Sequence, residues 1–269
     1  MHVHAPGGTP SASRLFRRPG RGECPRSRRR SQIPTAELRP APEDDRQERA
    51  DVTDERPVIG IFGAGKVGTA LARLLLAAGY EVVLSGSPRQ TALDLLVSVV
   101  APGARVADPA RLVEDADLII VAVPFGKSRT VPWEAFDGKV VVDATNYWPP
   151  IDGTIPAVDE DPRTTSEIHA AINPRARIVK SLNHLGYHEM EDDAMPAGSP
   201  LRRALAVVGD DADARDLVAR LIDDLGFDAV DGGRLANGRA LEPGHPAFGR
   251  ELSASELAAL MADERVPVG

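Results

Sequence analysis

From about residue 57 onward, the hydrophobic residues follow two patterns along the chain: continuous apolar runs, and apolar residues spaced three and four positions apart. Mostly apolar runs stand at 58–62, 82–84, 118–123 and 140–142. Runs of this kind are typical of parallel strands that are covered on both faces. Between the runs, apolar residues recur three and four positions apart, which is the spacing of an amphipathic helix. The alternation predicts strands and helices that follow one another along the chain.

The clearest helical segment follows the first apolar run. Its apolar positions fall on one helical face, and Gly79 marks its end; they are Val67, Ala70, Leu71, Leu74, Leu75 and Ala78. Further helices are expected at 91–100, 109–114, 164–172, 213–225 and 251–264, and further strands at 105–107, 176–182, 204–208 and 227–230. Asp108 before Pro109 predicts a helix start, and Thr164 and Glu167 have the spacing of a capping box. The Pro- and Gly-rich stretch 147–162 is expected to be a loop.

The first 56 residues show neither hydrophobic pattern and differ from the rest of the chain in charge. Nine arginines face two glutamates between residues 1 and 39, although the whole chain has a net charge of −8. A segment so poor in apolar residues does not bury enough surface to offset its ordering entropy, so we expect it to be disordered. It is either a basic interaction arm or an extension from a start codon assigned too early. Because the remaining chain is acidic, we expect no nucleic-acid binding.

A glycine pattern stands at the junction of the first strand and the first helix. The strand runs directly into Gly63-Ala64-Gly65-Lys66-Val67-Gly68, and the helical spacing begins at once. Gly63 allows a tight turn, Gly65 lets a pyrophosphate approach the backbone, and Gly68 lets helix and strand pack closely. The phosphates would lie at the helix N-terminus, where free N–H groups and the dipole favour an anion. The whole stretch predicts a dinucleotide-binding site.

The turn after the second strand indicates which dinucleotide is bound. Enzymes that prefer NAD place a carboxylate near this point to accept hydrogen bonds from the ribose 2′-hydroxyl. Residues 83–90 contain no acid and instead offer the hydroxyls of Ser85 and Ser87 and the guanidinium of Arg89. Such groups bind a 2′-phosphate, so the sequence favours NADP(H) over NAD(H). The competing interpretation is an ordinary turn with a solvated arginine.

Other candidate residues follow later strands. Ligands of a doubly wound sheet bind beyond the carboxyl ends of its strands, which places Val123, Pro124 and Asn146 beside the nicotinamide. Asn146 is either a hydrogen-bond partner of the carboxamide or an ordinary turn residue. Asn183 and His184 leave the strand at 176–182, and we take them as the catalytic candidates. A polar surface loop is the alternative for this segment.

Metal and thiol chemistry are not expected. His184 and His188 are four residues apart, but they follow a strand and lack the spacing of a zinc helix, so we predict no metal site. The single cysteine, Cys24, lies in the tail, which excludes a disulfide framework. No apolar run is as long as a membrane span, and the tail lacks the apolar stretch of a secretory signal. We expect a cytoplasmic protein without a membrane partner.

Several stretches together resemble the NADPH-dependent reductases of the deazaflavin coenzyme F420, whose first domain is similar to that of pyrroline-5-carboxylate reductases. The resemblance covers about residues 57–249. It rests on the glycine pattern, the Ser- and Arg-bearing turn, and the stretches 116–124, 207–211, 221–227, 232–235 and 241–243. It implies a hydride transfer between NADP(H) and F420 as co-substrate.

The patterns and the resemblance lead to one fold and one domain scheme. We predict an α/β fold, a Rossmann-type doubly wound parallel sheet with a small C-terminal α/β extension. Four regions are expected: a disordered basic tail at 1–56, an NADP-binding domain at 57–148, an acceptor-side α/β segment at 149–250, and a C-terminal helix and tail at 251–269.

The predicted function is an NADP(H)-dependent oxidoreductase with a small, planar acceptor. One alternative is a reductase of imines or keto acids, although that class needs a long helical C-terminal domain and only 251–264 remains for one. A non-catalytic NADP-binding redox sensor is the other. The sequence does not decide between a monomer and a homodimer.

Overall fold

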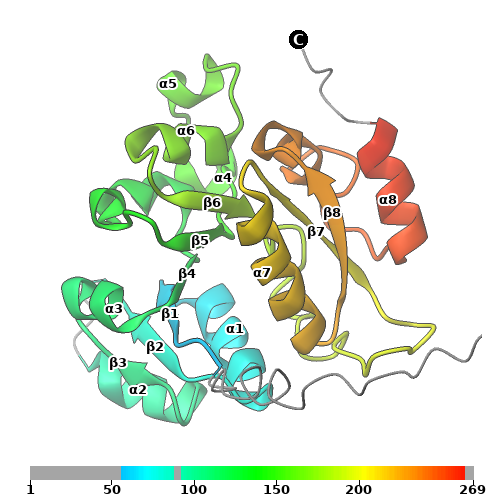
Figure 1. The fold of residues 1–269 in the computed structure, drawn as a ribbon. Coiled ribbons are helices and arrows are strands. Elements are labelled where there is room, and N and C mark those ends of the chain that lie inside the picture. The colour runs from blue at the N-terminus through cyan, green and yellow to red at the C-terminus, as the bar shows by residue number, and fades with distance from the viewer. Residues whose placement is uncertain (1–55, 88–91, 264–269) are drawn as a thin grey trace, which may run out of the picture. The chain divides into compact units, whose positions relative to one another are not determined.

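The computed structural model describes residues 56–87 and 92–263, all of which belong to one compact unit. Their strands form a single eight-stranded sheet in the order β3-β2-β1-β4-β5-β6-β7-β8 (Figure 1). The strands are β1 (Ile59–Phe62), β2 (Val82–Ser85), β3 (Arg105–Val106), β4 (Leu118–Val121), β5 (Val140–Asp143), β6 (Arg177–Lys180), β7 (Ala204–Gly209) and β8 (Asp228–Gly233). The predicted α/β class is confirmed.

The helices fall close to the predicted positions. They are α1 (Lys66–Ala77), α2 (Leu93–Val100), α3 (Pro109–Asp115), α4 (Pro149–Asp152), α5 (Pro156–Asp159), α6 (Thr165–Ile172), α7 (Ala212–Asp224) and α8 (Ala254–Asp263). The Asp108 carboxylate accepts from the backbone N–H of Arg111, and Thr164 and Glu167 form the expected reciprocal capping box. The 3₁₀ helices at Phe125–Thr130, Trp133–Ala135 and Leu235–Leu241 carry no periodic signal and were not predicted.

Each face of the sheet has its own hydrophobic layer. Side chains from α1, α2 and α7 pack with Ile59, Ile61 and Ile120 on one face. Residues of α3, together with Trp133 and Phe136, pack with Ile119 and Val141 on the other face. Alternate residues of β1, β4 and β5 therefore point into different layers, which is why these strands are almost wholly apolar.

Strand direction changes at one place in the sheet. Strands β1 to β6 pair in parallel, β7 runs antiparallel to β6, and β8 is parallel to β7. Residues 181–203, which join β6 to β7, contain no helix of the kind that returns the chain for a parallel crossover. The β7–α7–β8 unit is thus attached in reverse direction, and it makes up only a later part of the predicted segment 149–250. The expected boundary after residue 148 falls between neighbouring strands of one sheet.

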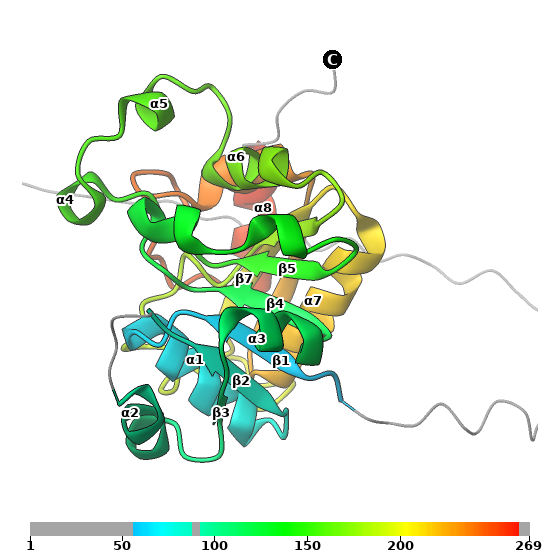
Figure 2. The same ribbon diagram turned by 90° about the vertical axis from the view of Figure 1, so that its left-hand side faces the viewer.

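The loop at 147–162 is more ordered than its sequence pattern indicates. It contains the one-turn helices α4 and α5, each of which begins at a proline. In Figure 2 both helices lie on a loop that projects beyond the sheet. The Asp152 carboxylate accepts hydrogen bonds from the backbone N–H groups of Gly126 and Trp148, which fastens α4 to the chain after β4. In the part of the chain that the structure describes, no helix is long and apolar enough to cross a membrane.

Candidate functional site

The glycine loop between β1 and α1 is fixed by two close backbone approaches. Gly63 has a φ of +117°, and a Cβ there would lie 2.4 Å from the Ala122 carbonyl oxygen. A Cβ on Gly68 would lie 1.8 Å from the Gly63 carbonyl oxygen. A Cβ on Gly65, by contrast, would meet no protein atom within 4 Å. The turn and the packing therefore need Gly63 and Gly68, whereas Gly65 leaves open space beside the backbone.

The N-terminus of α1 offers free hydrogen-bond donors beside this space. Gly65 is its N-cap and provides no side-chain cap, and the first turn holds no acidic residue. In α3, α6 and α7 the corresponding donors are satisfied by Asp108, Thr164 and Asp211. The uncapped start of α1 can accept an anion, as a pyrophosphate-binding loop requires.

A cavity of about 580 Å³ opens at the carboxyl ends of the parallel strands. This volume lies within the usual range for small-molecule sites. It is lined by the glycine loop, by the chain after β4, β5 and β6, and by a few residues near 248: Gly65, Lys66, Val67, Ala122, Val123, Pro124, Ala144, Thr145, Asn146, Trp148, Ile151, Asp152, Leu182, Asn183, His184, Leu185, Gly186, Tyr187, Glu189, Phe248 and Gly249.

Most of the candidate residues from the sequence meet in this cavity. Those that line it are Gly65, Lys66, Val67, Val123, Pro124, Asn146, Asn183 and His184. Gly63, Ala64 and Gly68 shape the loop from behind, and Ser85 is buried at the end of β2, where its carbonyl accepts from the Gly63 N–H. Ser87 is exposed, and Arg89 lies outside the described residues.

Two asparagines bridge the ends of β5 and β6 at the cavity wall. The Asn146 Nδ2 donates to the Asn183 carbonyl oxygen at 2.6 Å, and the Asn183 Nδ2 donates to the Asn146 Oδ1 at 3.0 Å. Asn183 also donates to the Leu241 carbonyl oxygen and is 4 % exposed. Asn146 is half-buried, and its Nδ2 group uses one of its two N–H donors for the Asn183 carbonyl oxygen, so the other can bind a ligand on the cavity side.

His184 lines the cavity but is bound to the protein at both ring nitrogens. Its Nε2 accepts from the Ala206 N–H at 3.2 Å, which leaves Nδ1 as the protonated nitrogen, 3.3 Å from the Asn183 Oδ1. Burial, with the charges of Arg203 and Lys180, lowers the pKa of His184 to about 3. The ring is therefore neutral at physiological pH. This geometry fits a residue that holds Asn183 in place.

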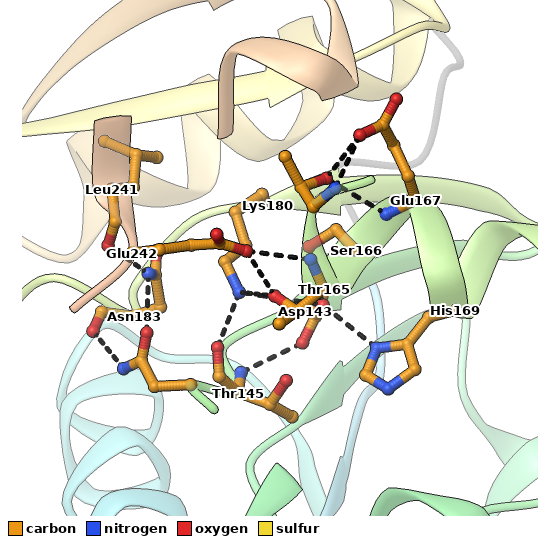
Figure 3. Close-up of polar contacts among 12 residues, drawn as sticks. Asp143, Thr145, Thr165, Ser166, Glu167, His169, Lys180, Asn183, Leu241 and Glu242 are labelled. Atoms are coloured by element: carbon orange, nitrogen blue, oxygen red, sulfur yellow. Dashed lines mark hydrogen bonds and ion pairs between the residues drawn. The ribbon is translucent and has the colours of Figure 1, made fainter. Parts of the chain in front are cut away.

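A buried polar cluster, absent from our sequence-based candidates, lies at the ends of β5 and β6 and on α6 (Figure 3). Asp143 and Lys180 are the last residues of β5 and β6, are paired in register, and are both 0 % exposed. The Asp143 carboxylate accepts from the Ser166 hydroxyl at 2.6 Å and lies 3.1 Å from the His169 Nδ1 and 3.8 Å from the Lys180 Nζ. Asp143 directly follows three valines and Lys180 directly follows Ile178 and Val179, and these charges after apolar residues were the available sequence signal.

The charge state of Asp143 follows from its neighbours. Burial raises the pKa of this carboxyl group, but the charges of Lys180 and His169 and the hydrogen bonds from His169 and Ser166 outweigh burial. The pKa of Asp143 therefore lies well below its ordinary value, and the group is ionised at neutral pH. A buried ion pair of this kind is costly to break from one side, because the remaining charge is left without a partner.

The aromatic residues divide between the core and the cavity mouth. Trp133 is 2 % exposed and stacks on His169 at 4.3 Å between ring centroids, so it is a core residue. Tyr147 packs against Phe125. Trp148 is 43 % exposed, lines the cavity and lies 5.7 Å from the ring of Phe248. Of Trp133, Tyr147 and Trp148, only Trp148 lines the cavity.

Another part of the cavity wall lies between the glycine loop and the segment after β6. The Lys66 ammonium lies 5.2 Å from the ring centroid of Tyr187, and both residues line the cavity. Within residues 56–87 and 92–263 there is no group of three or more His, Cys, Asp or Glu side chains placed to hold a metal ion. The cavity thus extends from the glycine loop to an aromatic chamber beside Trp148 and Phe248.

Comparison with known proteins agrees with this geometry. The family model described as NADP oxidoreductase, coenzyme F420-dependent, matches residues 58–147, from β1 to the end of the β5 turn. The metalloreductase STEAP3 of Rattus norvegicus is 28 % identical over 196 residues, which are 72 % of this chain and 37 % of that protein. The chain therefore spans little more than a third of the length of this curated relative.

Two solved structures match over most of the described residues. A hypothetical protein, SMa0349, from Sinorhizobium meliloti is 30 % identical, with a TM-score of 0.63, over 73 % of this chain and 95 % of that chain. A protein from Arthrobacter sp. FB24, provisionally named an F420-dependent NADP-reductase, is 28 % identical, with a TM-score of 0.58, over 68 % of this chain and 87 % of that chain. The chain therefore belongs to the family of NADP oxidoreductases described as coenzyme F420-dependent.

Proposed function

We propose that this protein transfers a hydride between NADP(H) and a planar acceptor, and that the deazaflavin coenzyme F420 is that acceptor. The observation that carries the proposal is a continuous cavity that connects the glycine loop to the aromatic chamber. Such a cavity can hold the pyrophosphate and nicotinamide at one side and a second flat ring at the other. The nicotinamide, when bound, supplies the hydride.

The residues of the chain would then bind, orient and exclude water. The N-terminus of α1 and Gly65 hold the pyrophosphate, and Lys66 adds a positive charge at the same point. Asn146 has the free N–H that a carboxamide oxygen requires. Leu182 and Leu185 are buried beside the chamber and keep it apolar. A hydride transfer between two rings held face to face needs no further acid or base, which agrees with the neutral, hydrogen-bonded state of His184.

The preference for NADP(H) over NAD(H) rests on the turn after β2. Ser87 is exposed there, and no acid from 83 to 90 competes for a ribose hydroxyl. Arg89→Ala is expected to weaken NADPH binding by about 1.5–3 kcal/mol and NADH binding much less, because one charge-assisted hydrogen bond to the 2′-phosphate is lost. Isothermal titration with both cofactors measures the difference. Equal affinities of the unmutated protein for NADPH and NADH would contradict the assignment.

F420 is the preferred acceptor because the family description and the name of the Arthrobacter relative both point to it. The rat metalloreductase similarity is a reason to include a ferric chelate among the acceptors. A cyclic imine is included as well, because small imines are the acceptors of the alternative reductase class considered from the sequence.

The proposal is tested by following NADPH oxidation with F420, FMN, a cyclic imine and a ferric chelate in parallel. We expect turnover with F420 above every other acceptor, and no turnover in a Gly65→Ala variant, because a methyl group would occupy the space needed by the pyrophosphate. NADPH binding without turnover on any acceptor would favour a redox sensor instead. Faster turnover with the imine or the chelate would reassign the acceptor.

A further inference from the structure

The ends of β5 and β6 are joined by two successive rungs. In the lower rung, the register partners Asp143 and Lys180 form a fully buried ion pair. In the upper rung, three residues farther along each segment, Asn146 and Asn183 exchange hydrogen bonds at the cavity wall. Lys180 and Asp143 do not line the cavity, whereas both asparagines do. The charged rung therefore lies behind the amide rung.

The ion pair binds the backbone of Thr145, the residue directly before Asn146. The Asp143 Oδ1 accepts from the backbone N–H of Thr145 at 2.9 Å, and the Lys180 Nζ donates to the Thr145 carbonyl oxygen at 2.5 Å. Both backbone hydrogen-bonding groups of Thr145 are thus bound by the two charges (Figure 3). Because Asn146 is the next residue, this arrangement fixes the direction from which its side chain enters the cavity.

The surrounding contacts keep the pair in one position. Asp143 is bound on its other oxygen by Ser166 and His169 of α6. Lys180 has a second acceptor in the Thr165 hydroxyl at 3.3 Å, which itself donates to Glu242 at 2.7 Å. Hydrophobic residues would fill this position at lower cost, since desolvation of a buried pair often offsets its attraction. Stability alone therefore does not explain why two charges are buried immediately behind a ligand cavity.

We propose that the Asp143–Lys180 pair is a positioning device, which holds the Thr145–Asn146 turn in the orientation that binds the nicotinamide carboxamide. Asn146 contacts the carboxamide, and Asp143 and Lys180 act through the Thr145 backbone. This inference deepens the proposed function and rests on it. It predicts that loss of the pair affects the nicotinamide end of the cofactor and leaves the adenosine and phosphate end unchanged.

Two ligands separate these ends. NADP⁺ and 2′-phospho-ADP-ribose share the adenosine, the 2′-phosphate and the pyrophosphate, but only NADP⁺ carries the nicotinamide. The ratio of their dissociation constants, measured by calorimetry, reports the nicotinamide contribution without any turnover. The informative variant is the double substitution Asp143→Asn with Lys180→Met, since either single change would leave an unpaired buried charge. The double variant is expected to melt above either single variant.

A matched control exists at the opposite end of the same strand. Arg177 begins β6 and forms an ion pair with Asp211, the N-cap of α7, at 2.8 Å. Arg177→Met with Asp211→Asn removes this pair and keeps a capping side chain. This double variant is expected to lose stability while its ligand ratio remains that of the unmutated protein.

In the Asp143→Asn, Lys180→Met variant, we expect NADP⁺ to bind about 3- to 10-fold more weakly, as for one lost hydrogen bond, with 2′-phospho-ADP-ribose unaffected. In an Asn146→Ala background the same double substitution should cause no further change, because the residue through which it acts is gone. If the ratio of the two dissociation constants is unchanged, whether both affinities stay the same or fall equally, the pair is only structural. If the unmutated protein binds neither ligand, the proposed function itself fails.

Discussion

The two ends of the cavity are built by different means. At the β1–α1 end, the shape is made by the backbone: Gly63 and Gly68 approach other main-chain atoms so closely that no side chain fits. At the β5–β6 end, the shape is made by side chains: a buried ion pair and an asparagine pair hold the turn after β5. The first end depends on the missing side chains of Gly63 and Gly68. The second end depends on the Asp143–Lys180 and Asn146–Asn183 pairs.

This difference explains how each end responds to change. A side chain added at Gly63 or Gly68 collides with main-chain atoms, so the loss of stability is steric in origin. A polar side chain truncated at the side-chain-built end leaves a polar or charged group without a partner, so the loss of stability is electrostatic in origin. Substitutions at the two ends therefore differ in size, in pH dependence and in the ligand part that they affect.

The largest expected effect comes from the backbone-built end. Gly68→Ala places a methyl group 1.8 Å from the Gly63 carbonyl oxygen, so strand and helix must separate. We expect a loss of more than about 3 kcal/mol in the free energy of unfolding, measured by urea denaturation. Gly65→Ala is the matched control, since the same methyl group meets no protein atom there. It should keep its stability and lose NADP(H) binding; equal destabilisation of both variants would contradict the assigned roles.

The second effect belongs to the side-chain-built end and depends on pH. His184 has a folded-state pKa of about 3, below its ordinary value of 6.5, so unfolding takes up a proton between these values. Its contribution to stability is complete above pH 6.5 and is lost as the pH falls toward 3, at up to about 1.4 kcal/mol per pH unit. Urea midpoints measured from pH 7 to pH 4 should fall accordingly.

His184→Gln is the control for this slope, because an amide can accept from the Ala206 N–H without titrating. The variant should be less stable than the unmutated protein at pH 7 and should lose less stability on acidification. Asp143 does not interfere, since its pKa is lowered and its contribution is lost only below its ordinary value of 3.8. Parallel pH profiles for both proteins would show that His184 is not buried as a neutral ring.

The smallest effect concerns the aromatic mouth of the cavity. Trp148→Ala removes a ring that is 43 % exposed, so the melting temperature should change little. If the acceptor packs on this ring, its affinity should fall by about 0.5–1.5 kcal/mol, the usual contribution of an aromatic pair. Trp133→Ala, at 2 % exposure, should do the reverse and cost about 3–5 kcal/mol in stability. Acceptor titrations of both variants sharpen the distinction between mouth and core.

The sequence predicted the backbone-built end well because its information is local. Gly63, Gly65 and Gly68 lie within six residues, directly between an apolar run and a helical spacing. The strands and the capping box at Thr164 were predictable for the same reason, and the direction of β7 and β8 was not, because pairing depends on distant partners.

The side-chain-built end could be predicted only in part. Asn146 and Asn183 were recognised because they follow strands, but their mutual hydrogen bonds join positions 37 residues apart. Asp143 and Lys180 each look like the ordinary polar end of a strand, and only the register of β5 with β6 brings the charges together. The hydrogen bond from the Ala206 N–H to His184 joins positions 22 residues apart, so no local pattern identifies it.

The most direct test of hydride transfer in this cavity is the fate of a labelled hydrogen. NADPH carrying deuterium at the transferred position of nicotinamide C4 is incubated with the protein and F420, and the reduced deazaflavin is examined by mass spectrometry. A deazaflavin accepts the hydride on carbon, from which it does not exchange with water. We expect one deuterium in each reduced F420 molecule. Reduced F420 without deuterium, or no reduction of F420, would contradict it.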